Sequence, residues 1–108
     1  MPENYRQLSE ELFAKMADFF DNLATRAPDL DADWLDDQVF KIEFENGNEV
    51  LISKHDSSEE IWLSAPSGGF HFHLENGKWL DSRTQQEFSS CLAECLKQAG
   101  QLNVDLPF

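Results

Sequence analysis

The clearest fold signal in the sequence is QVFKIEFENGNEVLI, residues 38–52. Phe40, Ile42 and Phe44 alternate with charged residues, which is the period-two pattern of a strand that buries one face. An Asn-Gly pair follows, the strongest short signal for a β-hairpin, and apolar residues return beyond it. The register stays open, because a two-residue turn and a three-residue turn with a bulge place different residues opposite Phe44.

Three further strands continue this hairpin toward the C-terminus. Residues 61–64 (IWLS) are typical of a third strand, which ends at the turn signal PSGG of residues 66–69. Residues 70–74 (FHFHL) alternate as a fourth strand. A second Asn-Gly hairpin at residues 75–78 leads into a fifth strand at residues 79–81. We therefore predict about five antiparallel strands in a row.

An amphipathic helix precedes these strands. Asn4 is predicted to cap it, with Gln7 three residues later in a variant of the capping box. Pro28 is predicted to stop the helix, and residues 29–33 (DLDAD) to form a linker. The apolar residues recur at steps of three and four and form one stripe: Tyr5, Leu8, Leu12, Met16, Phe19 and Leu23.

A second amphipathic helix follows the strands. Residues 84–87 (TQQE) match a capping box at its start, and Gly100 occupies the place of a C′ glycine at its end. Residues 102–106 alternate like a short strand or a segment packed along a groove. The apolar stripe of this helix consists of Phe88, Cys91, Leu92, Cys95 and Ala99.

This order of elements predicts the fold class. Two amphipathic helices and a sheet with one apolar face most simply form an α+β two-layer sandwich, with both helices on one face of the antiparallel sheet. We expect one domain over residues 1–108, because a chain of 108 residues is the size of one ordinary domain. The second sheet face, which we call the outer face, is left to solvent or to a partner.

The composition limits the classes of partner. The formal net charge is −13, with 21 acidic and 8 basic residues. Nucleic acid and anionic membranes are disfavoured, because binding them requires clustered Lys and Arg. Neither a membrane span nor a signal peptide is predicted. We expect a soluble, cytoplasmic protein whose acidic surface attracts cations or a basic protein face.

The negative charge is concentrated in the N-terminal half. Residues 1–49 hold 13 acidic and 4 basic residues, against 8 and 4 in residues 50–108. Asp18 and Asp21 are three residues apart on a helix, close enough to share a hard cation or to repel each other. A solvated helix face is the alternative explanation. We name as the acidic ridge, and as candidate metal ligands, Glu10, Glu11, Asp18, Asp21, Asp29, Asp31 and Asp33.

The outer face is predicted to carry a second group of candidates. Trp62 lies between Glu60 and Ser64, two polar residues on the same face of the strand, so it is expected on the outer face, either as an interface residue or half-covered by neighbours. His71 and His73 form a His-x-His pair, which can hold a borderline metal but more often is exposed polar surface. The candidate partner-binding residues are Ser53, Lys54, Glu60, Trp62, His71 and His73.

Other motifs are rejected or have structural explanations. Asp29, Asp31 and Asp33 resemble the start of a calcium loop, but Trp34 and Phe40 stand where Gly and Glu are required. Cys91 and Cys95, four residues apart on the apolar stripe, are expected to pack as small core residues. No nucleophile elbow, phosphate-binding loop or catalytic His with a partner nucleophile is found in the sequence.

The runs FENG (44–47), IWLS (61–64) and GFHF (69–72), with Trp79, in a helix–strands–helix frame, resemble the frataxin family, and specifically its short bacterial CyaY-type branch. The resemblance implies a small iron-binding protein of iron–sulfur cluster assembly that binds a cysteine desulfurase and its scaffold protein. It also favours Trp62 as an interface residue. Ala17 departs from the family pattern where a carboxylate is expected, which shifts weight to Asp18 and Asp21.

We therefore expect a non-enzymatic regulator that binds ferrous or ferric iron weakly, with other divalent cations able to substitute. A monomer is expected, with oligomers in the presence of iron. An alternative is an acidic mimic protein that occupies a basic or nucleic-acid-binding site on another protein. A ferroxidase would require a protected di-iron site such as paired Glu-x-x-His motifs, which the sequence lacks.

Overall fold

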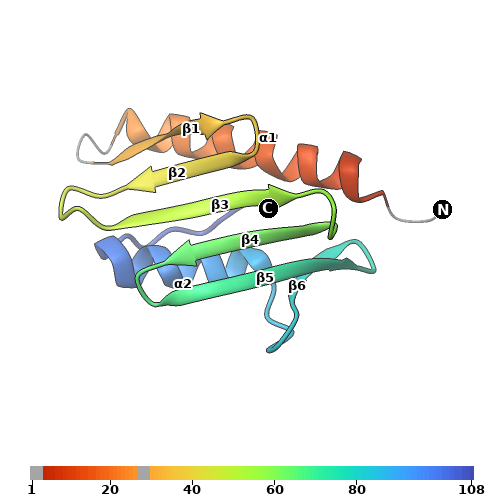
Figure 1. The fold of residues 1–108 in the computed structure, drawn as a ribbon. Coiled ribbons are helices and arrows are strands. Elements are labelled where there is room, and N and C mark those ends of the chain that lie inside the picture. The colour runs from red at the N-terminus through yellow and green to blue at the C-terminus, as the bar shows by residue number, and fades with distance from the viewer. Residues whose placement is uncertain (1–3, 27–29) are drawn as a thin grey trace.

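The computed structural model describes residues 4–26 and 30–108, which form two helices and six strands. The sheet is antiparallel, and each strand pairs with its neighbours in the sequence. Both helices lie against one face of the sheet, as predicted, and leave the outer face uncovered (Figure 1). The elements are α1 (Tyr5–Ala24), β1 (Asp31–Asp36), β2 (Val39–Glu43), β3 (Glu49–His55), β4 (Glu60–Ala65), β5 (Gly68–Glu75), β6 (Lys78–Asp81) and α2 (Phe88–Gly100).

The first Asn-Gly hairpin adopts the three-residue turn. Glu43 pairs with Glu49, and the backbone N–H of Phe44 donates to the carbonyl of Asn48 at 2.9 Å. Gly47 has a φ of 90°, the conformation that the bulge of this turn requires. The second hairpin is a two-residue turn, because Glu75 pairs directly with Lys78.

The strand β1 corrects the prediction of a linker. Asp31 pairs with Glu43 and Trp34 with Phe40, so residues 31–36 form an edge strand of the sheet. Carboxylates at every second position hide this strand from a sequence pattern, because only the two residues Ala32 and Trp34 pack toward the helices. Pro28, the predicted stop of the first helix, lies outside the described residues, and α1 ends at Ala24.

The helix ends confirm one predicted cap and correct two. Asn4 caps α1, its Oδ1 accepting from the N–H of Gln7 at 3.2 Å. The predicted capping box at Thr84 is wrong, because α2 begins at Phe88 with Glu87 as N-cap. At the C-terminus of α2 the left-handed conformation falls on Gln101, with a φ of 57°, and not on Gly100.

Two local contacts explain these corrections. The buried Asp81 carboxylate accepts from the N–H of Arg83 at 2.7 Å and from that of Thr84 at 3.0 Å, which holds Thr84 in a turn before the helix. Gly100 lies directly against the ring of Phe44, where a Cβ would collide. Glycine is therefore needed at position 100 for close packing between α2 and the hairpin, not for its backbone freedom.

The core fills the space between the sheet and the two helices. Ile42, Ile52, Leu63 and Phe72 from the sheet are almost completely buried there. Beyond α2, residues 101–108 form no helix or strand but pack along the core through alternate side chains. Phe108, at the end, contacts Phe19 of α1 at 6.0 Å between ring centroids. In the described residues, no helix is long and apolar enough to cross a membrane.

Candidate functional site

The acidic ridge runs along helix α1 and the edge strand β1. Helix α1 carries four of its residues and β1 carries two, and all six are exposed. Because α1 packs against β1, these residues lie along one edge of the molecule (Figure 1). The described members are Glu10, Glu11, Asp18, Asp21, Asp31 and Asp33. Asp29 lies outside the described residues.

The ridge does not enclose a metal ion in the described part of the chain. Glu10 forms an exposed ion pair with Arg6 at 3.8 Å, and Glu11 accepts a hydrogen bond from Gln7 at 3.4 Å. The Oδ1 atom of Asp33 accepts from the N–H of Trp34 at 2.8 Å. Among residues 4–26 and 30–108, no three Asp, Glu, His or Cys side chains converge as metal ligands. The ridge therefore offers separate, exposed carboxylates and not an enclosed metal site among the described residues.

A shallow hollow of about 330 Å³ lies between α1 and β1. Asp18 and Asp21 line it from the helix, and Asp33 and Trp34 line it from the strand. Trp34 is 40% exposed. The sequence does not single out Trp34, except as a residue that excludes a calcium loop. The hollow itself forms only when α1 packs on β1, so no local pattern could reveal it.

On the outer face, Trp62 is half-buried between two histidines. Its indole ring stacks on His55 at 3.7 Å and on His71 at 4.1 Å between ring centroids. His55 belongs to β3 and His71 to β5, the two strands that flank β4, so the indole is sandwiched between the imidazoles. Trp62 thus exposes an edge of its indole ring and not a free face. Its Nε1–H donates to Glu60 Oε1 at 3.0 Å.

His71 and His73 are not arranged as a metal-binding pair with each other. Both ring nitrogens of His73 have partners, with Nδ1 at 3.4 Å from Ser82 Oγ and Nε2 at 3.1 Å from Glu75 Oε2. The ring of His71 lies flat on Trp62. His73 therefore belongs to a polar cluster at the end of β5, and His71 belongs to the aromatic stack.

The remaining candidates divide between the two sheet faces. Ser53 pairs with Trp62 across the strands, and its Oγ lies 3.0 Å from His55 Nε2. Ser53 therefore shares the outer face with the aromatic stack. Lys54 pairs with the buried Ile61, and its Nζ lies 5.6 Å from the centroid of the Phe13 ring, on the helix side. The structure thus does not bring Lys54 together with Trp62.

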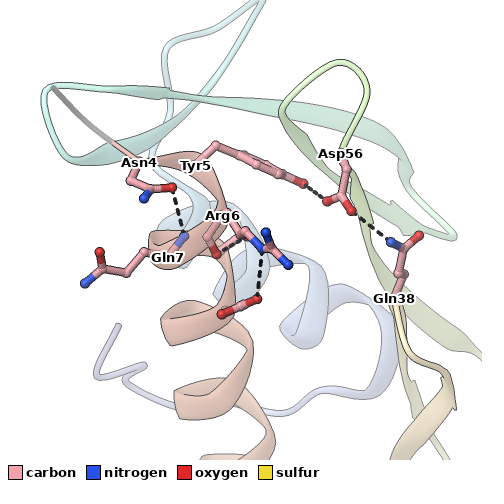
Figure 2. Close-up of polar contacts among 8 residues, drawn as sticks. Asn4, Tyr5, Arg6, Gln7, Gln38 and Asp56 are labelled. Carbon is pink, nitrogen blue, oxygen red and sulfur yellow. Dashed lines mark hydrogen bonds and ion pairs between the residues drawn. The ribbon is translucent and has the colours of Figure 1, made fainter.

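A polar network that the sequence did not reveal joins three segments next to this stack. Tyr5 Oη donates to Asp56 Oδ1 at 3.0 Å, and Gln38 Nε2 donates to Asp56 Oδ2 at 3.0 Å (Figure 2). The Asp56 carboxylate, directly after β3, therefore connects the start of α1 with the β1–β2 turn. Burial of Tyr5 and its hydrogen bond to Asp56 raise the pKa of the phenol above its usual range.

The two cysteines belong to the core, as the sequence predicted. Cys91 and Cys95 are each 2% exposed on the inner side of α2. A hydrogen bond with Cys95, together with burial, raises the pKa of the Cys91 thiol. A protonated, buried thiol is a poor nucleophile and a poor metal ligand.

Comparison with known proteins now relates this arrangement to a family. A frataxin-like domain model matches residues 1–102. The chain belongs to the frataxin-like family.

Curated members of this family share about two fifths of their aligned residues with the chain. An iron–sulfur cluster assembly protein CyaY from Paraburkholderia phymatum is 41% identical over 64 residues, 58% of this chain and 61% of the relative. A CyaY from Neisseria meningitidis is 37% identical over 68 residues, 63% of this chain and 64% of the relative. The aligned part thus spans less than two thirds of these relatives.

Solved frataxin structures share the fold over most of the chain. The frataxin from Psychromonas ingrahamii, of the CyaY family, superposes with a TM-score of 0.79 at 26% identity, over 96% of this chain and 95% of that chain. A trimeric yeast frataxin, from Saccharomyces cerevisiae and complexed with ferrous iron, superposes with a TM-score of 0.73 at 24% identity, over 94% and 90%. The second likeness concerns the fold alone.

Proposed function

We propose that this protein regulates iron–sulfur cluster assembly, without enzymatic activity of its own, by binding a cysteine desulfurase and its scaffold protein in the cytoplasm. The observation that carries this proposal is the frataxin-like match over residues 1–102. The curated relatives of that family are named as iron–sulfur cluster assembly proteins. The polarised charge and the aromatic stack on an uncovered sheet face support a role in binding other proteins.

The two surfaces have different tasks in this proposal. The acidic ridge attracts a basic face of the desulfurase, because opposite charges accelerate association at long range. Trp62 and its flanking histidines form the second contact, to the scaffold or to the mobile cysteine loop of the desulfurase. An edge of a rigid, stacked indole suits an interface because it loses little conformational freedom on binding.

Iron is cargo in this proposal and not a resident cofactor. A yeast frataxin with the same fold binds ferrous iron as a trimer. We propose that ferrous or ferric iron binds this chain weakly along the acidic ridge, foremost at Asp18 and Asp21, and that other divalent cations substitute for it. The absence of three converging ligands in the described residues supports weak binding. The protein is monomeric without iron in this proposal, and iron can bring copies together.

The competing function is an acidic mimic that occupies a basic or nucleic-acid-binding site on another protein. The net charge of −13 fits both functions, but a mimic does not require the aromatic stack on the outer face. Affinity capture from bacterial cytoplasm with mass spectrometry separates the two. Recovery of the desulfurase and scaffold supports the proposal, whereas recovery of DNA-binding proteins in their place contradicts it.

Binding kinetics with purified desulfurase then test the two surfaces separately. Asp21→Lys is expected to slow association, most strongly at low salt. Trp62→Ala is expected to weaken binding by about 1–4 kcal/mol with little dependence on salt, as a truncated interface aromatic does. Unchanged association of Asp21→Lys would show that the ridge does not guide docking, and unchanged affinity of Trp62→Ala would remove the stack from the interface.

A further inference from the structure

In the described part of the chain, the large apolar side chains that are exposed lie in the acidic edge strand. Trp34 is 40% exposed and Leu35 is 56% exposed, and the two are neighbours in β1. Contiguous exposed apolar side chains within a polar surface are a common mark of an interaction site. This pair therefore marks a candidate interaction surface that is separate from Trp62.

The two side chains are held differently. The indole of Trp34 stacks on Phe13 at 5.7 Å and meets Phe40 edge-on at 5.4 Å, which fixes its orientation. Leu35 has no residue opposite it, because the register passes from the Trp34–Phe40 pair directly to Asp36 and Val39. The indole of Trp34 is thus held in one orientation by its aromatic neighbours, whereas Leu35 projects from a β-bulge at the edge of the sheet.

Trp34 forms part of the hollow of about 330 Å³ between α1 and β1. The buried ring of Phe40 also lines the hollow, so part of its wall is apolar and aromatic. Three carboxylate residues, Asp18, Asp21 and Asp33, line the same space and are exposed. The hollow therefore combines an aromatic surface with negative charge.

The strand β1 supplies no positively charged side chain to offset this negative charge. Residues 30–40 contain no Lys or Arg. Lys41, the cross-strand partner of Asp33, has its Nζ 3.7 Å from Glu43 and 3.6 Å from Glu49. Among the described residues no Lys or Arg forms an ion pair with Asp18, Asp21 or Asp33, so a cation supplied by a partner would complement the hollow.

We propose that the hollow receives an arginine side chain of a basic partner protein, and that an apolar side chain next to that arginine covers Leu35. This inference rests on the proposed function of the ridge and specifies the chemistry of its partner. A guanidinium is planar, stacks on aromatic rings and pairs with carboxylates, so it matches both parts of the hollow. A lysine ammonium is more strongly hydrated and gains less from the indole.

The test uses the intact chain and two synthetic peptides that repeat glycine, a basic residue and leucine, one with arginine and one with lysine. Binding is followed through the indole N–H signals of the three tryptophans by NMR. The arginine peptide is expected to bind at least threefold more tightly than the lysine peptide, and to shift the Trp34 signal most. Equal affinities, no binding, or shifts centred on Trp62 would overturn the inference.

Three variants sharpen the result. Trp34→Leu is expected to abolish the preference for the arginine peptide. Leu35→Ser is expected to weaken the binding of both peptides at least threefold. Leu80→Ser, the same substitution at a half-buried leucine of the opposite edge strand β6, is the control and should change neither affinity. Leu35→Ser alters a side chain without a cross-strand partner, so it remains informative even if Trp34→Leu proves unstable. Unchanged binding of Leu35→Ser would contradict the inference.

The proposed function can fail independently of this inference. If the arginine preference is found but the desulfurase does not bind, the hollow is real and the assigned partner is wrong. If the desulfurase binds and responds to Asp21→Lys, but the two peptides bind equally, the proposed function stands and the arginine pocket is rejected.

Discussion

At the scale of single residues, neighbours decide what a side chain can do. Trp62 lies on the outer face as its alternation predicts, yet His55 and His71 cover both faces of its indole. His73, a candidate partner-binding residue, has both ring nitrogens occupied by Ser82 and Glu75. Strand periodicity predicts the face on which a residue lies, but not the contacts made there.

The two tryptophans Trp62 and Trp79 should differ in their contribution to stability. Trp62→Ala removes two stacking contacts on a half-open face and is expected to lower the free energy of unfolding by about 1–2 kcal/mol. Trp79→Ala empties a core site, since Trp79 is 9% exposed, and should cost about 3–5 kcal/mol. Urea denaturation of both variants measures the difference. An equal or greater loss for Trp62→Ala would mean that the stack is a structural element and not a binding surface.

Tyr5 predicts a specific loss of stability in alkali. Its pKa is raised in the folded state by burial and by Asp56, whereas the unfolded chain releases this proton near pH 10. Above about pH 10 the unfolded state therefore binds fewer protons than the folded state, and stability falls as the pH rises. This contribution is fully present below about pH 10.

The chain contains one tyrosine, so absorbance at alkaline pH reports the ionisation of Tyr5 alone. The titration should occur at higher pH in the folded protein than in urea. The unfolding free energy of Tyr5→Phe should fall less steeply than that of the parent chain above pH 10. Parallel pH profiles for the two proteins would show that the phenol is not protected.

At the scale of elements, the ends of helices and strands depend on contacts with distant segments. The end of α2 is an example, because Asn46 and Asn48 of the β2–β3 turn both donate to the carbonyl of Ala99, at 2.9 and 2.8 Å. The hairpin thus caps the helix from another part of the chain. A local capping rule at Gly100 could not foresee this arrangement.

Two neighbouring substitutions test the roles of the residues at the end of α2. Gly100→Ala places a methyl group against the ring of Phe44 and is expected to lower stability by about 1–3 kcal/mol. Gln101→Gly relieves a left-handed residue and should raise stability by about 0.5–1 kcal/mol. Thermal unfolding of the two variants decides between the sites. The opposite order of effects would mean that Gly100 occupies the left-handed position.

At the scale of the whole molecule, negative charge is distributed unevenly over the surface. The ridge collects like charges along one edge, while His71, His73 and the buried Asp81 belong to β5 and β6 on the opposite side of the sheet. Such a distribution steers a charged partner toward one face but stores repulsion in the free protein. Binding and stability are therefore expected to respond in opposite directions to removal of ridge charge.

Neutralising the ridge should stabilise the free protein. Asp18→Asn and Asp21→Asn are each expected to raise the unfolding free energy by about 0.2–0.5 kcal/mol at low salt, because they remove a like-charge pair one turn apart. High salt should abolish the gain. Asp105→Asn, an exposed aspartate in the C-terminal segment, is the control and should have a smaller effect. A lower melting temperature for both ridge variants in metal-free buffer would contradict the repulsion.

Features that depend on local periodicity and turn chemistry could be predicted from the amino-acid sequence. The apolar stripe of α1 with its Asn4 cap, both Asn-Gly hairpins, the α+β class and the location of the acidic residues follow from neighbours within a few positions. These interactions act over short distances along the chain, so the pattern of residues contains them.

Features that require distant segments of the chain to meet could not be predicted from the sequence. β1 became a strand because β2 supplied its hydrogen bonds and α1 covered Ala32 and Trp34, although its own residues resemble a polar linker. The aromatic stack around Trp62, the Asp56 network and the hollow beside Asp18 likewise join side chains from two or three elements. Propensity is a weak prior for such segments, because the burial and pairing that outweigh it come from partners elsewhere in the fold.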